Sequence, residues 1–220
     1  MANRRNDVFG ADTPDETLRN TPGVQTQELD FEIPVETVPL PSKGLAYPID
    51  HPLHACQTVD IKAMTAREED ILTSRAFIKK GTVITELIRS CLIDKRIDPN
   101  SLLAGDRNAL MVAIRITGYG VEYQTEVNCP ACDTKDKYEF NLAELPITSL
   151  GADPVDAGTN AFDFTLPMTK KRVAFKFLTG RDEQEIMVAS ERRKKGGIMG
   201  DNLVTNKLQY TLINIDGKTD

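Results

Sequence analysis

Apolar residues recur at helical spacing in three segments of the chain. They follow one face through residues 65–81 and again through residues 83–92. A third segment, residues 106–117, is apolar on almost every side, which predicts the most buried helix of the fold. We therefore expect a cluster of helices in the first half of the chain.

Signals at the ends of these segments support the helical interpretation. Thr65 and Glu68 have the spacing of a capping box, and Gly81 can take the left-handed conformation that ends a helix. Asp106 is a suitable N-cap for the third helix. Cys91 falls on the apolar face of the second helix, where a small buried side chain is expected.

Alternation of apolar and polar residues predicts two antiparallel hairpins. Residues 121–127 and 137–142 alternate on either side of a polar turn, and residues 162–166 and 172–178 do the same farther along. Residues 59–61 predict a further short strand.

The C-terminal part returns to helical spacing. Residues 182–195 predict a helix beginning at Asp182 and ended by two glycines, while residues 203–215 are equally compatible with helix and strand. The predicted fold class is α+β. It is a helical cluster packed with antiparallel β-hairpins, one of which carries a zinc-ribbon-like Cys-x-x-Cys knuckle at its tip.

Composition divides the chain into four parts. Residues 1–33 are polar, acidic and punctuated by prolines, so we expect a disordered or extended N-terminal arm. Residues 34–145 hold the helices and the Cys-x-x-Cys hairpin, residues 146–160 form a linker, and residues 161–220 hold the second hairpin and the C-terminal helices. The arm either orders along a partner or stays a solvated tail.

Acidity is concentrated at the N-terminus. The net charge is −6, of which −5 falls on residues 1–40, and the chain lacks tryptophan. A near-neutral body with few aromatics opposes nucleic-acid binding, and the basic run 192–195 is typical of a solvated helix end, with a phosphate or acidic contact as the alternative. Without a membrane-length apolar run or a secretory signal, we expect synthesis in the cytoplasm and no membrane partner.

A proline-rich segment precedes the helical cluster. Prolines at positions 39, 41 and 48 exclude a helix, and the sequence Ser-Lys-Gly between them favours a turn. Two interpretations are open: a structural loop pinned by its own side chains, or a loop that docks on a partner. The candidate partner-binding residues are Leu40, Pro41, Ser42, Lys43, Gly44 and Tyr47.

Cys129 and Cys132 carry the most specific chemical signal. Two thiolates three positions apart on a tight turn can bind one zinc ion, but a closed tetrahedral site needs two further ligands. No second Cys-x-x-Cys pair exists, and the other soft ligands are His51, His54 and Cys56. The candidate metal ligands are therefore Cys129 and Cys132 together with His54 and Cys56.

Other interpretations of the cysteine pair stay open. The site could be completed from outside the chain, or the knuckle could have lost its metal and persist as a hairpin turn, or the two thiols could be ordinary reduced cysteines. A redox pair is disfavoured, because redox motifs tend to open helices whose N-termini lower the thiol pKa. No motif of a known enzyme class is present, so we expect neither catalysis nor a small-molecule substrate.

Several ordered blocks together resemble one family. They are Pro39–Gly44, the helix start Met64–Leu72, the stretch Gly105–Gly120, and Asn128–Cys132. This pattern over residues 35–145 resembles the T4-type baseplate proteins of contractile-tailed phages, which are often described as baseplate hub subunits. None of the blocks is catalytic.

The resemblance implies a structural or assembly protein of a virion tail baseplate, made in the host cytoplasm, whose partners are other tail and baseplate proteins. An acidic arm, a proline-stiffened loop and no catalytic constellation agree with a role in binding neighbours. Two alternatives are a transient assembly chaperone and a zinc-ribbon regulator that binds nucleic acid. A thiol oxidoreductase based on Cys129 and Cys132 is a third.

Overall fold

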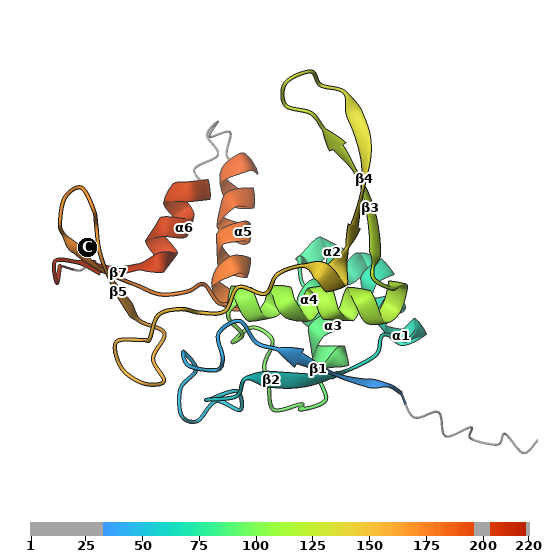
Figure 1. Cartoon of the computed structure of the whole chain (residues 1–220), viewed down its shortest axis with the longest axis horizontal. Helices are drawn as coiled ribbons and strands as arrows, with labels where there is room; N and C mark the ends of the chain where they lie inside the picture. Colours follow the sequence, from blue (N-terminus) through green and yellow to red (C-terminus); the bar gives the residue numbers. More distant parts are fainter. Residues whose placement is uncertain (1–32, 196–202, 219–220) are drawn as a thin grey trace, which may run out of the picture. The chain divides into compact units, whose positions relative to one another are not determined.

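The structure is a computed structural model that describes residues 33–195 and 203–218 (Figure 1). Its contacts divide the chain into residues 1–32 and residues 33–220. The predicted N-terminal arm lies almost wholly outside the described residues. The remainder combines helices with antiparallel sheets of two or three strands, which confirms the α+β class.

Fourteen elements follow one another along the described chain. In order they are β1 (Val35–Pro39), β2 (Thr58–Lys62), α1 (Ala66–Thr73), α2 (Arg75–Lys80), α3 (Val83–Cys91), α4 (Ala104–Tyr119), β3 (Glu122–Asn128), β4 (Lys135–Asn141), the 3₁₀ turn η2 (Leu142–Glu144), β5 (Phe162–Thr165), β6 (Arg172–Phe175), α5 (Gly180–Lys195), α6 (Leu203–Thr211) and β7 (Leu212–Ile215).

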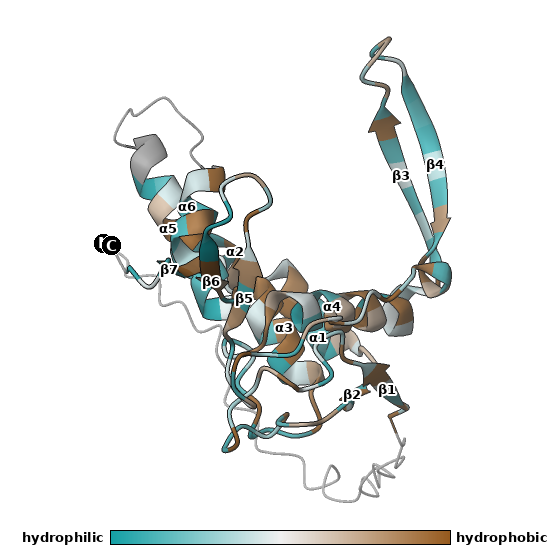
Figure 2. Ribbon diagram, turned by 60° about the vertical axis from the view of Figure 1, so that its left-hand side comes forward, coloured by the Kyte–Doolittle hydropathy of each residue, from teal (hydrophilic) through white to brown (hydrophobic). Residues whose placement is uncertain are grey.

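The main core lies where the β1–β2 pair meets α3 and α4. Ile61, Ile88 and Leu110 are completely buried there, and Cys91 is buried beside them as predicted. Figure 2 shows hydrophobic segments along α3 and α4. Full burial of each such side chain contributes about 1.5–3 kcal/mol, so this cluster is the main apolar source of stability.

The prediction of one helix over residues 65–81 is wrong in one respect, because the structure forms two helices there, α1 and α2. Ser74 has φ −66° and ψ 110°, which ends α1 and begins α2. The hydroxyl of the preceding Thr73 donates to the carbonyl of Glu69 at 3.0 Å, a local bond that competes with regular helix geometry. Gly81, at φ 69°, ends α2 as predicted.

Two predicted helix starts are also corrected. Helix α4 begins at Ala104 with Leu103 at the N-cap, so Asp106 is not the cap but a buried residue of the first turn. Helix α5 begins at Gly180, two residues before Asp182. The Asp182 carboxylate accepts from the backbone N–H and hydroxyl of Thr179, each at 2.8 Å, and so supports the helix start from inside the first turn.

Residues 203–215, whose pattern was compatible with helix and with strand, form a helix followed by a strand. Helix α6 is followed directly by β7, which pairs with β6, so that β5, β6 and β7 form one antiparallel sheet. The predicted pair of strands at 162–166 and 172–178 is confirmed with shorter bounds. Phe162 is buried against the rings of Phe175 and Phe177.

Residues 146–160 contact the rest of the fold. The Leu150 N–H donates to the Pro41 carbonyl at 2.7 Å, and Leu150 packs against the main core. Farther along, the Ala104 N–H donates to the Leu178 carbonyl at 2.8 Å, which ties the start of α4 to the chain after β6. The first residues of the predicted linker, Pro146, Ile147 and Thr148, also line an apolar groove on the surface, which is described in the next subsection.

Glu68 forms a polar centre within the helical cluster. It is fully buried and accepts from the Lys62 ammonium at 2.7 Å, from the Ser90 hydroxyl, and from the backbone N–H of Thr65 at 3.0 Å. The Thr65–Glu68 capping box is confirmed. Burial alone would raise the pKa of this carboxyl, but the hydrogen bonds from Lys62, Ser90 and Thr65 outweigh it and lower the pKa to about 2.

We predict that this carboxylate makes folding pH-dependent in the acid range. Since its folded pKa is depressed, its contribution is complete above the ordinary value of 4.5 and is lost as the pH falls toward about 2. Replacing Glu68 by Gln should cost roughly 2 kcal/mol in urea unfolding at pH 7 and much less at pH 3. Glu69→Gln, at the exposed neighbouring position, is the control, and an equal cost at both pH values would contradict the prediction.

Candidate protein-binding surface

A single buried carboxylate holds the loop that follows β1. Asp106 Oδ1 accepts from the backbone N–H of Ser42 at 2.9 Å, and Oδ2 accepts from the hydroxyls of Ser42 and Tyr47 at 2.6 and 2.7 Å. All three residues are buried. Hydrogen bonds to a charged group are worth about 1.5–3 kcal/mol each, so this carboxylate fixes the loop to the first turn of α4.

Both hydroxyls act as acceptors as well as donors. Ser42 Oγ accepts from the Gly44 N–H at 3.1 Å, and the Tyr47 hydroxyl accepts from the Leu103 N–H at 3.0 Å. Burial, and then the charge of Asp106, raises the pKa of Tyr47 far above its ordinary value, so its hydroxyl keeps its proton and remains a donor. The Tyr47 ring also stacks on His51, with centroids 4.5 Å apart.

The tip of the loop has room only for glycine at position 44. Lys43 and Gly44 both have positive φ, 53° and 72°. A Cβ added to Gly44 would lie 2.4 Å from the backbone nitrogen of Cys56 and 2.5 Å from the Leu53 carbonyl oxygen. The close approach of the two backbones therefore requires glycine for both conformational and steric reasons.

The structure buries four of the six predicted partner-binding residues within this chain, namely Leu40, Ser42, Gly44 and Tyr47. Pro41 is half-buried and Lys43 is exposed. The loop thus has a structural role in the chain itself, and contact with a partner stays a prediction, chiefly for Pro41 and Lys43. Sequence analysis missed Asp106 as the organiser of the loop, because its partners lie 59 to 64 positions away.

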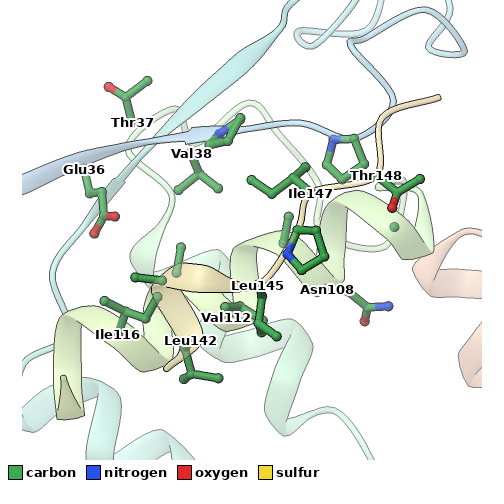
Figure 3. Close-up of a pocket in the computed structure, with 17 residues that line it drawn as sticks. Glu36, Thr37, Val38, Asn108, Val112, Ile116, Leu142, Leu145, Ile147 and Thr148 are labelled. Atoms are coloured by element: carbon green, nitrogen blue, oxygen red, sulfur yellow. The ribbon is translucent and has the colours of Figure 1, made fainter. Parts of the chain in front are cut away.

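The fixed loop leaves an apolar groove beside it (Figure 3). The groove has a volume of about 470 Å³ and lies between β1, α4 and the segment 142–148. Its walls carry mainly aliphatic side chains, including Val38, Val112, Ile116, Leu145 and Ile147. Leu145 and Ile147 are exposed, so part of this apolar lining faces solvent.

A second hollow continues from the first. Pro41, Gly105 and Thr148 border both, and the second, of about 570 Å³, is lined farther along by Leu150 and Phe177, among others. Contiguous exposed apolar surface of this kind is typical of sites that bind a protein or a ligand. We refer to the first hollow, lined by β1, α4 and residues 142–148, as the β1–α4 groove.

The outer edge of β1 lies along this groove. Thr37 is paired with Asp60 of β2. The Asp60 carbonyl accepts from the Ile93 N–H, so it points away from β1. Because backbone groups alternate in an antiparallel ladder, the N–H and C=O of Val35 and Thr37 point away from β2. Within the described residues no strand pairs with this edge of β1. Pro39 is at the next outward position, where a proline is tolerated.

The predicted Cys-x-x-Cys hairpin is formed by β3 and β4, whose seven-residue strands pair in register from Glu122↔Asn141 to Asn128↔Lys135. Cys129 is half-buried and Cys132 exposed at the turn, and neither forms a disulfide. The side chain and N–H of Thr134, and then the Cys129 thiol, lower the pKa of Cys132 through hydrogen bonds. A lowered thiol pKa favours the thiolate that metals bind.

The four predicted zinc ligands are not brought together. His54 Nδ1 lies 2.7 Å from the Tyr47 carbonyl oxygen, and Cys56 Sγ donates to the Pro52 carbonyl at 3.5 Å. Both therefore belong to the loop region, whereas the hairpin tip is seven residues, or roughly 20 Å, beyond the hairpin base. In the described parts of the chain no three His, Cys, Asp or Glu side chains are grouped to hold a metal ion.

Comparison with known proteins decides the family. The model of the family described as T4 bacteriophage base plate protein matches residues 33–157, more than half of the chain. The chain belongs to this baseplate family. The match covers β1, the Ser42–Gly44 turn, α4 and the β3–β4 hairpin. No curated protein and no solved structure matches the chain.

Family membership supports a structural component of a phage baseplate, as predicted from the resemblance. None of the helices in the described residues has the length and apolar character needed to cross a membrane. The basic run predicted at 192–195 begins with the exposed Arg192, and its other side chains lie outside those described. Nothing in the baseplate family match points to an enzyme.

We predict that Gly44→Ala unfolds at markedly lower urea concentration than the unchanged protein. The left-handed φ and the contact with the Cys56 backbone together should cost roughly 3 kcal/mol. Gly151→Ala is the matched control, since a Cβ there meets nothing within 4 Å. Equal unfolding midpoints for the two variants would show that the loop can move away from its observed position.

Proposed function

We propose that this baseplate protein acts by binding neighbouring tail and baseplate proteins, and that it does so in the baseplate hub of the virion tail. The observation that carries the proposal is the β1–α4 groove, an exposed apolar groove beside a strand edge that no described strand pairs with. Family membership supplies the class of partner. The hub assignment rests on the resemblance of the sequence blocks to hub proteins.

The chemistry of the groove favours an extended segment of a neighbouring baseplate protein. The backbone N–H and C=O groups of Val35 and Thr37 are arranged to pair with an added strand, while alternate side chains of that strand would enter the groove. Backbone pairing then supplies affinity, and the apolar walls select the side chains. The rigid anchoring of the loop by Asp106 keeps one end of the groove in place before binding, which lowers the entropic cost of association.

Charge restricts the partner further. Among the described residues that line the groove, Glu36 is the only charged one. A bound segment should therefore be mainly apolar, with a lysine or arginine where it passes Glu36. An acidic segment would place like charges together in a partly desolvated groove, which costs free energy.

We predict that the full-length protein captures tail and baseplate proteins, hub proteins among them, from infected cells. The captured proteins should be identified by mass spectrometry and then purified for direct binding measurements. Capture of other baseplate proteins without hub proteins would contradict the hub assignment alone. If no tail or baseplate component is captured, the proposed function is wrong.

The groove itself is tested with two isoleucines. Ile147 is 55% exposed in the groove, and Ile49 is 86% exposed outside it. Ile147→Asp should weaken binding to a captured partner by about tenfold or more, whereas Ile49→Asp should change it less than about twofold. In hydrogen exchange, the Val35 and Thr37 amides should become protected in the complex. Equal affinities of the two variants, or unprotected amides, would exclude this groove as the binding site.

We predict that the protein is retained in purified virions at a fixed ratio to other baseplate proteins. A structural component stays in the particle, whereas a transient assembly chaperone binds similar partners and then leaves. Quantitative mass spectrometry of purified virions separates the two. Its absence from particles, combined with capture of baseplate proteins from infected cells, would establish the chaperone alternative instead.

A further inference from the structure

The β3–β4 hairpin has two chemically different faces. Cross-strand partners share a face, so the pairs Tyr123↔Phe140 and Thr125↔Tyr138 lie on the same side. The opposite side carries mostly charged and amide residues, for example at the pair Glu126↔Lys137. The first side is the apolar face, and it consists of Val121, Tyr123, Thr125, Val127, Tyr138 and Phe140.

Most of this apolar face is not covered by the described part of the chain, although the Arg115 guanidinium lies over the Tyr123 ring at its base, 5.9 Å from the centroid. Tyr123, Val127, Tyr138 and Phe140 are all exposed, and Tyr138 has 57% of its surface accessible. A two-stranded hairpin alone is marginally stable in water, and an aromatic face exposed to water adds no burial to stabilise it. Figure 1 shows the hairpin extending away from the helices, with its turn at the distal end. The arrangement is that of an element that packs against another surface.

The turn at the distal end places two thiols beside one another. The Asp133 N–H donates to the Cys129 carbonyl at 2.9 Å, and the Cys129 N–H donates to the Thr134 carbonyl at 3.0 Å, which closes a tight turn with Asp133 at φ 57°. Cys132 Sγ lies 3.0 Å from Thr134 Oγ1 at the exposed end of the turn. This supplies half of a tetrahedral zinc site, accessible from outside the chain.

We propose that two copies of this chain bind one zinc ion between their hairpin tips, each contributing Cys129 and Cys132, with the apolar faces of the two hairpins packed against each other. Tetrahedral coordination by four thiolates is a standard structural zinc site, and each thiol gives up its proton on binding. A two-fold axis through the ion relates the copies. The same surface patch then meets itself, as in most dimers.

A second copy fits the face better than an unrelated partner. Its tip supplies the same two soft ligands, the number that the first pair lacks. Apart from Asp136, at the tip end opposite Val127, and the Arg115 guanidinium over Tyr123 at the base, the face carries no charge, so two copies can approach without strong repulsion. A partner that lacked paired cysteines would leave the zinc site open.

The size of the face makes the dimer dependent on zinc. Two strands of seven residues present a face of roughly 20 Å by 10 Å, a few hundred Å². A stable protein interface buries about 800 Å² on each partner. The apolar contact alone therefore falls short, and the metal bonds must contribute the remainder. The groove described above is not involved, so the two binding modes are independent.

Sedimentation velocity of the reduced full-length protein, with zinc chloride or with a chelator, tests the proposal. We expect a dimer with about one zinc per two chains, and a monomer after chelation. Cys129→Ser should abolish both zinc binding and the dimer. Cys56→Ser is the matched control, because this cysteine lies outside the hairpin, and it should behave like the unchanged protein.

The contribution of the apolar face is tested separately. Tyr138→Ser should weaken the zinc-loaded dimer by about tenfold, while Glu139→Ser, on the opposite face of the same strand, should have little effect. Both side chains are exposed, so neither change threatens the folded body. A monomer with one zinc per chain, no zinc binding, a dimer that survives chelation or the Cys129→Ser change, or equal effects of the two face variants would each overturn the proposal. None of these outcomes depends on capture of baseplate proteins through the groove.

Discussion

The buried carboxylate of Asp106 is the constraint on which the arrangement of the N-terminal half depends. It joins the loop after β1 to the first turn of α4 through three hydrogen bonds, and two further bonds extend from its partners to Gly44 and Leu103. Polar groups buried this deeply are tolerated only when each finds a partner. The network meets that condition, so it specifies one position of β1 relative to α4.

That position in turn defines the groove. Its two long walls are β1 and α4, and the segment 142–148 forms the third. Without the Asp106 bonds the wall formed by β1 would be held mainly by its ladder with β2. A polar network remote from solvent therefore shapes an apolar surface that faces solvent, and the proposed function depends on both.

Local patterns in the sequence predicted most of the helices and strands, but few of the contacts between them. The capping box, the two hairpins and the burial of Cys91 followed from residues close together in the chain, and each is confirmed. The pairing of β1 with β2 was not predicted, since its partners are 19 to 27 positions apart and prolines flank β1. Ser74 interrupts a helix whose apolar spacing continues unbroken through it.

The candidate site also shows that local roles were predicted and contacts between elements were not. Glu68 and Asp106 were interpreted through their own helices, the first as a capping-box residue and the second as an N-cap. Both are buried acceptors for residues on other elements, Ser90 and Lys62 for the first and Ser42 and Tyr47 for the second. Spacing along a chain does not encode such contacts. The four candidate zinc ligands lie on two separate segments, two at the hairpin turn and two in the loop region, because a shared chemistry does not by itself bring segments together in space.

The separation of Asp106 from Ser42, 64 positions along the chain, also has a consequence for synthesis. At about 5–20 residues per second, the ribosome needs roughly 3–13 s after making Ser42 before Asp106 is translated, and longer before Asp106 leaves the exit tunnel. Throughout that interval the Ser42 and Tyr47 hydroxyls lack their native acceptor and hydrogen-bond to water instead. The native position of the loop beside β1 can therefore be fixed only after α4 has emerged.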